Sequence, residues 1–175
     1  MIKSIILGSG CFWCSEAAYQ QVKGVVGIVS GYADGGDNRP TYELVSSGES
    51  GYVEVVEIKY DDTIIKLKDI LNIFWIIHDP TSLNRQGNDV GTQYRSTILY
   101  KDKADLSIIN SSLKEAATHF SEPIVTIVKQ LEIFYPAEEY HQNHFQNHPE
   151  KAYCQVIINP KLTKLRQEMS HYLKD

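Results

Sequence analysis

The chain has no run of apolar residues that approaches the roughly 20 needed for a membrane-spanning helix. It also has no cluster of Lys and Arg, and its formal net charge of −5 argues against a general nucleic-acid-binding protein. Residues 1–4 lack the charged, apolar and small-residue regions of a signal peptide. These absences predict a cytoplasmic protein that acts on neither membranes nor nucleic acids.

Cysteine is scarce. The three cysteines, Cys11, Cys14 and Cys154, are an odd number and too few for a disulfide scaffold. In a reducing compartment such residues are catalytic thiols, redox thiols or buried core thiols. The sequence therefore predicts thiol chemistry, and a purely structural role for any one of the three remains open.

Strand-like and helix-like segments alternate along the chain. Runs of β-branched and aromatic residues bounded by Gly, Pro, Asp or Asn predict strands at 2–7, 25–32, 52–60, 96–100, 124–129 and 153–158. Apolar residues at helical spacing predict helices at 14–22, 65–77, 103–120, 137–147 and 162–173. This alternation indicates an α/β protein with a mixed sheet flanked by helices.

Two long polar stretches, 33–51 and 78–94, interrupt this alternation. Loops of that length in a compact domain are usually functional or disordered, and their aromatic and charged residues favour function. There is no internal repeat, low-complexity tract or linker. We therefore expect residues 1–175 to form a single domain, long enough to bury a substantial core.

The most informative motif is Gly-Cys-Phe-Trp-Cys-Ser-Glu at 10–16. Cys11 follows a glycine turn at the start of an expected helix, where unpaired N–H groups favour a thiolate. Phe12 and Trp13 come next and can wall an apolar pocket. Cys14 is close enough to react with Cys11, as in redox Cys-x-x-Cys sites.

Six segments in order resemble the peptide methionine sulfoxide reductase A family. They are Gly-Cys-Phe-Trp at 10–13 with Glu16, Gly-Tyr at 31–32 before a Gly-rich turn, Pro-Thr-Tyr at 40–42, Gly-Tyr-Val-Glu-Val-Val at 51–56, the whole of 78–96, and Ala-Glu-Glu-Tyr-His-Gln at 137–142. Tyr-Cys at 153–154 also resembles one C-terminal variant of the family. The similarity covers nearly the whole chain.

The resemblance implies an enzyme that reduces the S epimer of methionine sulfoxide, free or in oxidised proteins, to methionine. It implies a ferredoxin-like two-layer sandwich and a monomer. No metal or organic cofactor is expected, and the electrons would come from an external dithiol, thioredoxin. The enzyme would repair oxidised proteins under oxidative stress.

Reduction of a sulfoxide requires a nucleophile at sulfur, a proton donor for the oxygen, and an apolar socket for the methyl group. Cys11 supplies the nucleophile, and Phe12 with Trp13 supplies the socket. By resemblance, Glu54 is the proton donor. Its apolar neighbours predict a poorly solvated carboxyl with a raised pKa, which would stay protonated near neutrality.

Tyr42, Tyr94 and Asp89 match family positions that bind and orient the sulfoxide. Two phenol hydroxyls can donate to the S=O oxygen, and Asp89 could hold a tyrosine or a water in place. One departure from the family pattern is Tyr52, which stands where a histidine is usual.

After attack, Cys11 would be a sulfenic acid that must be returned to the thiol. A second thiol can condense with it to a disulfide, which a dithiol then reduces by exchange. Cys14, one helical turn away, is slightly favoured over Cys154, whose sequence context resembles a buried strand. Direct reduction of Cys11 remains the third possibility.

Two rival functions are open at this stage. A thioredoxin-like disulfide oxidoreductase could use Cys11 and Cys14, although it would leave the polar loops unexplained. A zinc-binding module could use His141, His144 and His148, which lie near one face of the expected helix, with a cysteine as a further ligand.

Overall fold

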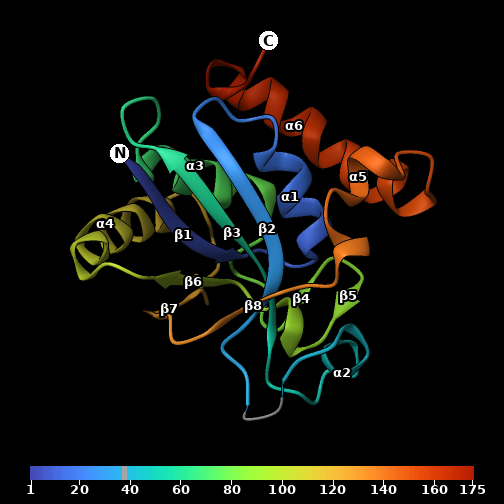
Figure 1. Cartoon of the computed structure of the whole chain (residues 1–175). Helices are drawn as coiled ribbons and strands as arrows, with labels where there is room; N and C mark the ends of the chain where they lie inside the picture. The colour runs from blue at the N-terminus through green and yellow to red at the C-terminus, as the bar shows by residue number, and fades with distance from the viewer. Residues whose placement is uncertain (37–38) are drawn as a thin grey trace.

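The chain folds around one mixed, six-stranded sheet (Figure 1). The computed structural model describes residues 1–36 and 39–175. The strand order is β7-β6-β1-β3-β2-β8, and only the β6–β7 pair is parallel among these neighbours. The strands are β1 (Ile2–Gly8), β2 (Val25–Ala33), β3 (Val53–Asp61), β6 (Thr97–Tyr100), β7 (Ile127–Gln130) and β8 (Phe134–Pro136). The predicted mixed sheet with helices is confirmed.

The helices gather on one face of this sheet (Figure 1). The longer ones are α1 (Phe12–Tyr19), α3 (Leu67–Ile77), α4 (Leu106–Ala117) and α6 (Asn159–Met169), and the short ones are α2 (Tyr42–Ser46) and α5 (His144–Asn147). A small hairpin, β4 (Arg85–Gln86) and β5 (Asp89–Val90), lies in the second polar stretch. Figure 1 shows α6 and α5 beside α1, so the C-terminal part of the chain returns to the beginning of the chain.

Alternation along the strands divides the sheet into two apolar faces. Ile5 and Leu7 of β1 belong to the large core shared with the helices, whereas Ile6 points to the opposite face. On that opposite face a smaller cluster is covered by Leu131 and Phe134. β1, β2, β3 and β6 therefore contribute to both cores.

α3 forms where helical periodicity predicted it. Leu67, Ile70, Leu71, Phe74 and Ile77 are all buried, as expected for a core-facing stripe. α1 is different, because nearly all of its residues are buried. It lies between the sheet and α6, which makes it the central helix of the fold.

The strand predicted at 153–158 is wrong. A π-helical segment, Cys154–Ile158, runs there directly into α6. Cys154 and Ile158 are fully buried while Val156 is 67% exposed, a pattern that fits one buried helical face and not a buried strand. The run of Val and Ile misled the prediction because β-propensity yields to tertiary packing.

The helix predicted at 137–147 is also largely wrong. The segment is irregular apart from a 3₁₀ turn, Glu139–His141, and the four-residue α5. Its backbone is used for docking, since Ala137 N–H donates to Ser30 O at 2.8 Å and Gln142 exchanges hydrogen bonds with the Ser30 backbone. The sequence analysis missed α2, which begins after Thr41, whose side chain accepts from Leu44 N–H.

Within the described part of the chain, no helix is both long and apolar enough to cross a membrane.

Replacing Leu71 by Ala should lower the free energy of unfolding by about 2–5 kcal/mol, because the fully buried side chain leaves a cavity between α3 and the sheet. Urea denaturation measures this change. Lys68→Ala on the exposed side of the same helix is the control and should change stability by less than about 0.5 kcal/mol. Equal effects of the two substitutions would contradict the assigned packing.

Candidate active site

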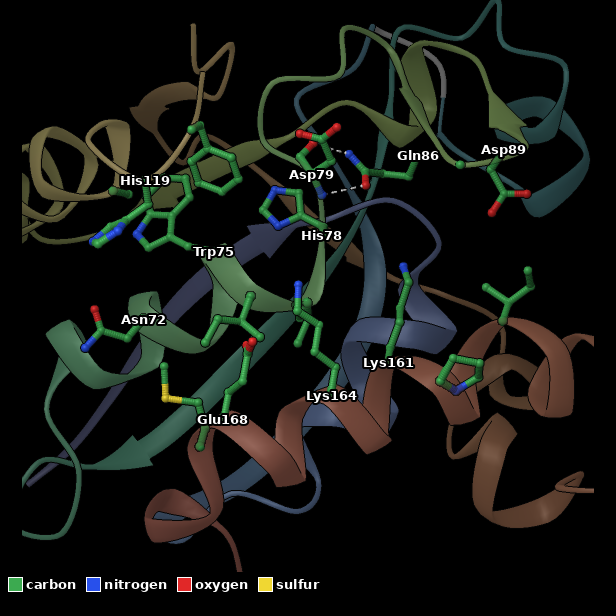
Figure 2. Close-up of a pocket in the computed structure, with 18 of the residues that line it drawn as sticks. Asn72, Trp75, His78, Asp79, Gln86, Asp89, His119, Lys161, Lys164 and Glu168 are labelled. Carbon is green, nitrogen blue, oxygen red and sulfur yellow. Dashed lines mark hydrogen bonds between the residues drawn. The ribbon is translucent and has the colours of Figure 1, made fainter. Parts of the chain in front are cut away.

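Cys11 lies at the junction between β1 and α1, where the chain turns sharply. The preceding Gly10 has φ +98°, and a Cβ there would come within 2.7 Å of the Gln86 side chain. Gln86 is itself held by two hydrogen bonds to the backbone of Asp79, which Figure 2 draws as dashed lines. Glycine is therefore required at position 10, and Gln86 fixes the turn that presents Cys11.

Glu54 projects from β3 toward this junction. Its side chain is 3% exposed and accepts a hydrogen bond from Phe12 N–H at 3.2 Å, the first N–H of α1. Burial raises the pKa of Glu54 to about 8 despite this hydrogen bond. The group is thus a carboxylic acid at neutral pH, as the sequence analysis expected from its apolar neighbours.

The two thiols of the motif form one interacting pair. Burial raises the pKa of Cys11 well above its ordinary value, and the neighbouring Cys14 and Glu54 raise it further. A hydrogen bond from Cys11 lowers the pKa of Cys14 to about 7, against the opposing effect of burial. The sequence analysis expected the thiolate on Cys11, but the geometry favours it on Cys14. The main cause is burial, which disfavours the charged form of Cys11.

Aromatic rings cluster around the two residues that follow Cys11. The Phe12 ring centroid lies 5.7 Å from that of Tyr32 and 5.4 Å from that of His141. Trp13 is half-buried and stacks on His144, with 3.8 Å between centroids. These rings form an aromatic cluster that includes Phe12 and Trp13, the two residues predicted to form the socket for the methyl group.

His141 belongs to this socket rather than to a metal site. It is fully buried beside Tyr42, with 4.3 Å between ring centroids, and neither ring nitrogen has a hydrogen-bond partner in the described chain. Among the described residues, no group of three or more His, Cys, Asp or Glu side chains could hold a metal ion. The zinc alternative with His141, His144 and His148 therefore finds no support in the geometry.

Tyr42 and Tyr94 converge on the reactive groups from two different elements. Tyr42 begins α2, and Tyr94 ends the 3₁₀ helix Thr92–Tyr94. Burial raises the pKa of both phenols, and the proximity of Glu54 and Cys11 raises each further. Both hydroxyls are consequently neutral hydrogen-bond donors beside the thiol.

Asp89 contacts a tyrosine that the sequence analysis did not single out. Tyr153 donates from its hydroxyl to Asp89 Oδ2 at 2.9 Å, and the Tyr153 hydroxyl oxygen lies 3.5 Å from Cys14 Sγ. Its ring packs edge-on against Trp13. Asp89 thus holds a tyrosine, as expected, but it is Tyr153 of the Tyr-Cys motif. The Tyr-Cys motif at 153–154 was the feature of the sequence that could have identified Tyr153.

Cys154 lies apart from this contact. Its side chain is fully buried, and its sulfur is 3.7 Å from His144 Nδ1. Burial raises the pKa of its thiol. All three cysteines are free thiols.

Two carboxylates attach the C-terminal segment to the site. Glu16 of α1 accepts hydrogen bonds from Ser30 Oγ and His144 N–H, each at 3.1 Å. Glu138 accepts from Tyr32 OH at 2.9 Å and from Tyr42 N–H at 3.0 Å. These contacts join residues that are 106 and 128 positions apart in the sequence.

Comparisons with known proteins agree with this arrangement. The family model for peptide methionine sulfoxide reductase matches residues 3–173. The peptide methionine sulfoxide reductase MsrA of Leptospira borgpetersenii is 53% identical over 158 residues, which cover 90% of each chain. The MsrA of Saccharolobus solfataricus is 48% identical over 158 residues, covering 90% of this chain and 89% of the relative.

Solved structures give the same result. Mxr1 of Saccharomyces cerevisiae in reduced form superimposes with a TM-score of 0.83 at 34% identity, covering 87% of this chain and 89% of Mxr1. The methionine sulfoxide reductase A of Corynebacterium diphtheriae gives a TM-score of 0.76 at 31% identity, covering 85% and 76%. A complex of Mxr1 with Trx2 also matches, with a TM-score of 0.60 at 27% identity over 80% and 84%. The chain belongs to the peptide methionine sulfoxide reductase A family.

Proposed function

We propose that Cys11 and Glu54 carry out the reduction of methionine sulfoxide to methionine in this enzyme, with the S epimer as substrate, free or within oxidised proteins. The chain is an oxidoreductase of this family. The observation that carries the residue assignment is the carboxyl of Glu54, which is 3% exposed, neutral at pH 7 and hydrogen-bonded to the residue after Cys11. Reduction of oxidised proteins in this way repairs them.

The proposed first step transfers the sulfoxide oxygen to Cys11. The Cys11 sulfur attacks the substrate sulfur while its proton passes to the Cys14 thiolate, its hydrogen-bond partner. Glu54 donates its proton to the oxygen, where it stays as the hydroxyl proton of the sulfenic acid, and Glu54 then takes up the proton that Cys14 had accepted, so that Cys14 is again a thiolate. The products are methionine and a sulfenic acid on Cys11, so the oxygen gained by the thiol equals that lost by the sulfoxide.

The socket and the phenols would orient the substrate for this step. Phe12 and Trp13 receive the methyl group, and the neutral hydroxyls of Tyr42 and Tyr94 donate to the oxygen. These donors stabilise the negative charge that grows on oxygen as the S–O bond weakens. Asp89 acts through Tyr153, which it holds against Cys14.

Cys14 is the proposed resolving thiol. It interacts directly with Cys11, whereas Cys154 is buried beside His144. Attack of the Cys14 thiolate on the sulfenic sulfur would form the Cys11–Cys14 disulfide, and the hydroxyl would leave as water with a proton from Glu54. A dithiol must then reduce that disulfide. The complex of Mxr1 with Trx2 supports thioredoxin as this reductant, and the thiol chemistry requires no metal or organic cofactor.

We further propose a ferredoxin-like core, supported by the succession β1-α1-β2-β3-α3-β6 and the spatial order β6-β1-β3-β2. A single domain over residues 1–175 fits the match of the family model to residues 3–173. A monomer is consistent with a site built entirely from one chain. The small, odd number of cysteines, too few for a disulfide scaffold, supports a cytoplasmic location.

Glu54→Gln should slow single-turnover sulfoxide reduction by about 10²–10⁴-fold, because the amide cannot supply the proton. In the wild type the rate should rise through about pH 7 as Cys14 ionises and fall through about pH 8 as Glu54 loses its proton. The alkaline fall should disappear in the variant. Glu57→Gln, on the opposite face of β3, is the matched control and should retain the wild-type profile. An unchanged alkaline limb in Glu54→Gln would remove this carboxyl from the mechanism.

Tyr42→Phe and Tyr94→Phe should each lower the single-turnover rate by about 10²-fold, since each removes one donor to the developing oxygen charge. Stopped-flow measurement of the Trp fluorescence change or quenched-flow assay of methionine follows the step. Tyr100→Phe, a half-buried tyrosine on β6, is the control. Normal rates in both variants would refute the proposed orientation of the substrate.

Cys14→Ser should still yield one methionine per enzyme but accumulate the Cys11 sulfenic acid, because no neighbouring thiol condenses with it. Cys154→Ser should form the same disulfide as the wild type. Mass spectrometry of the thiols after one turnover with each epimer, without reductant, distinguishes these states. A disulfide that involves Cys154 in the Cys14→Ser variant at the wild-type rate would reassign the resolving thiol.

A further inference from the structure

Tyr153 has two hydrogen-bond partners that compete for its one proton. Its hydroxyl donates to Asp89 Oδ2 at 2.9 Å, and the same hydroxyl oxygen lies 3.5 Å from Cys14 Sγ. Burial raises the pKa of Tyr153 well above its ordinary value, so the phenol keeps its proton. A phenol has a single proton to donate and lone pairs that accept. Tyr153 can therefore accept from the Cys14 thiol while it donates to Asp89, or it can donate to the Cys14 thiolate.

The two partners differ in their access to water. Cys14 is 4% exposed. Asp89 is half-buried and lines a cavity of about 1070 Å³ between α3, α4, α6 and the β4–β5 hairpin, which Lys161 and Lys164 also line (Figure 2). Water in this cavity can hydrate the Asp89 carboxylate when Tyr153 turns away, whereas the buried Cys14 thiolate depends on donors from the protein. The thiolate therefore needs the phenol proton more than the carboxylate does.

The other ionisable groups that face Cys14 come from five different segments. They are Cys11 at the start of α1, Glu54 of β3, Asp89 of β5, Lys161 of α6, and Cys154 of the π-helical segment. The hydrogen bond from Cys11 is the main cause that lowers the pKa of Cys14, against the opposing effect of burial. Lys161 and Tyr153 lower this pKa further, whereas Asp89 raises it.

The hydrogen bond from Cys11 is lost during the reaction. Once Cys11 is a sulfenic acid, its sulfur carries oxygen and no proton. Tyr153 then remains as a donor at hydrogen-bond distance from Cys14 Sγ. The thiolate that must attack the sulfenic acid is consequently the one that most needs this phenol.

We propose that Tyr153 is a positioning residue whose hydroxyl donates to Asp89 while Cys14 is a thiol and turns to donate to Cys14 Sγ when Cys14 is a thiolate. This inference rests on the proposed function, in which Cys14 accepts the Cys11 proton and later attacks the sulfenic acid. Asp89 is the acceptor in the first state and is hydrated from the cavity in the second. The change of partner stabilises the thiolate that forms the disulfide.

The proton count of the proposed cycle is unchanged by this movement. The hydroxyl rotates with its own proton, so no covalent bond of Tyr153 forms or breaks. The proton that leaves Cys14 passes to Glu54, and the thiolate left behind receives the hydrogen bond of Tyr153. When the disulfide forms, the Cys14 sulfur loses its negative charge and the hydroxyl returns to Asp89.

The test measures the pH at which Cys14 ionises, from the ultraviolet absorbance of the thiolate in each reduced protein minus that of its Cys14→Ser counterpart. Tyr153→Phe should raise this midpoint by about one pH unit, because the buried thiolate loses a charge-assisted hydrogen bond. The variant keeps the ring that packs edge-on against Trp13. The titration requires no sulfoxide turnover.

Asp89→Asn should move the midpoint in the opposite direction, to lower pH, because the amide competes less for the phenol proton and carries no negative charge. Tyr172→Phe is the matched control. It removes a hydrogen bond of the same kind, from the phenol to Asp69 Oδ1 at 2.7 Å, that involves no thiol, and it should leave the midpoint unchanged. A general loosening of the packing would not shift the midpoint in opposite directions.

The rate of disulfide formation after one turnover is the second readout, measured by acid quenching and mass spectrometry. Below the wild-type midpoint Tyr153→Phe should slow this step about tenfold, because its fraction of thiolate is smaller by that factor. Well above the midpoint of the variant, the rate should return to that of the wild type.

An unchanged midpoint in Tyr153→Phe would overturn the proposal, and so would a shift to higher pH in Asp89→Asn. A rate that falls by the same factor at every pH would also overturn it, because Tyr153 would then only maintain packing. Failure of the wild type to produce methionine, or to form the Cys11–Cys14 disulfide, would instead refute the proposed function. That result is obtained separately from the thiolate titration.

Discussion

The site depends on one buried contact, in which the carboxyl of Glu54 meets the first N–H of α1. This hydrogen bond joins the middle of β3 to the residue after Cys11, so the sheet and the helix start cannot move apart without exposing an unpaired carboxyl. Because the group is almost fully buried, the charged form is disfavoured and the proton is retained. The same burial that maintains the fold therefore keeps the carboxyl protonated, as the proposed acid role of Glu54 requires.

Low solvent exposure also determines how the thiols of Cys11 and Cys14 ionise. Two neighbouring buried thiols do not ionise independently, and their shared hydrogen bond favours one thiolate, on Cys14. Tyr153 and Asp89 extend this network to the cavity beneath α6.

The C-terminal half of the chain completes the socket through polar contacts instead of regular structure. Gln142 and Glu138 bind the backbone of β2 and the start of α2, and Glu16 anchors the start of α5. A regular helix through this segment would have used its own backbone groups internally. In the irregular conformation these backbone groups are available to bond to other segments of the chain. These contacts hold His141 against Phe12 and Tyr42.

Much of the fold could be predicted from the sequence, wherever the local pattern agrees with the tertiary packing. The strands around β1 and β3 and the stripe of α3 follow from alternation and helical periodicity, and the cysteine motif with its buried-strand glutamate indicated the chemistry. Residues 153–158 and 137–147 were mispredicted, since burial on one helical face and long-range hydrogen bonds override local propensity there. Only the tertiary structure determined which thiol ionises more readily and which groups Tyr153 contacts. The same is true of the cavity lined by Lys161 and Lys164. Each depends on groups far apart in the chain whose burial and mutual distance no local pattern encodes.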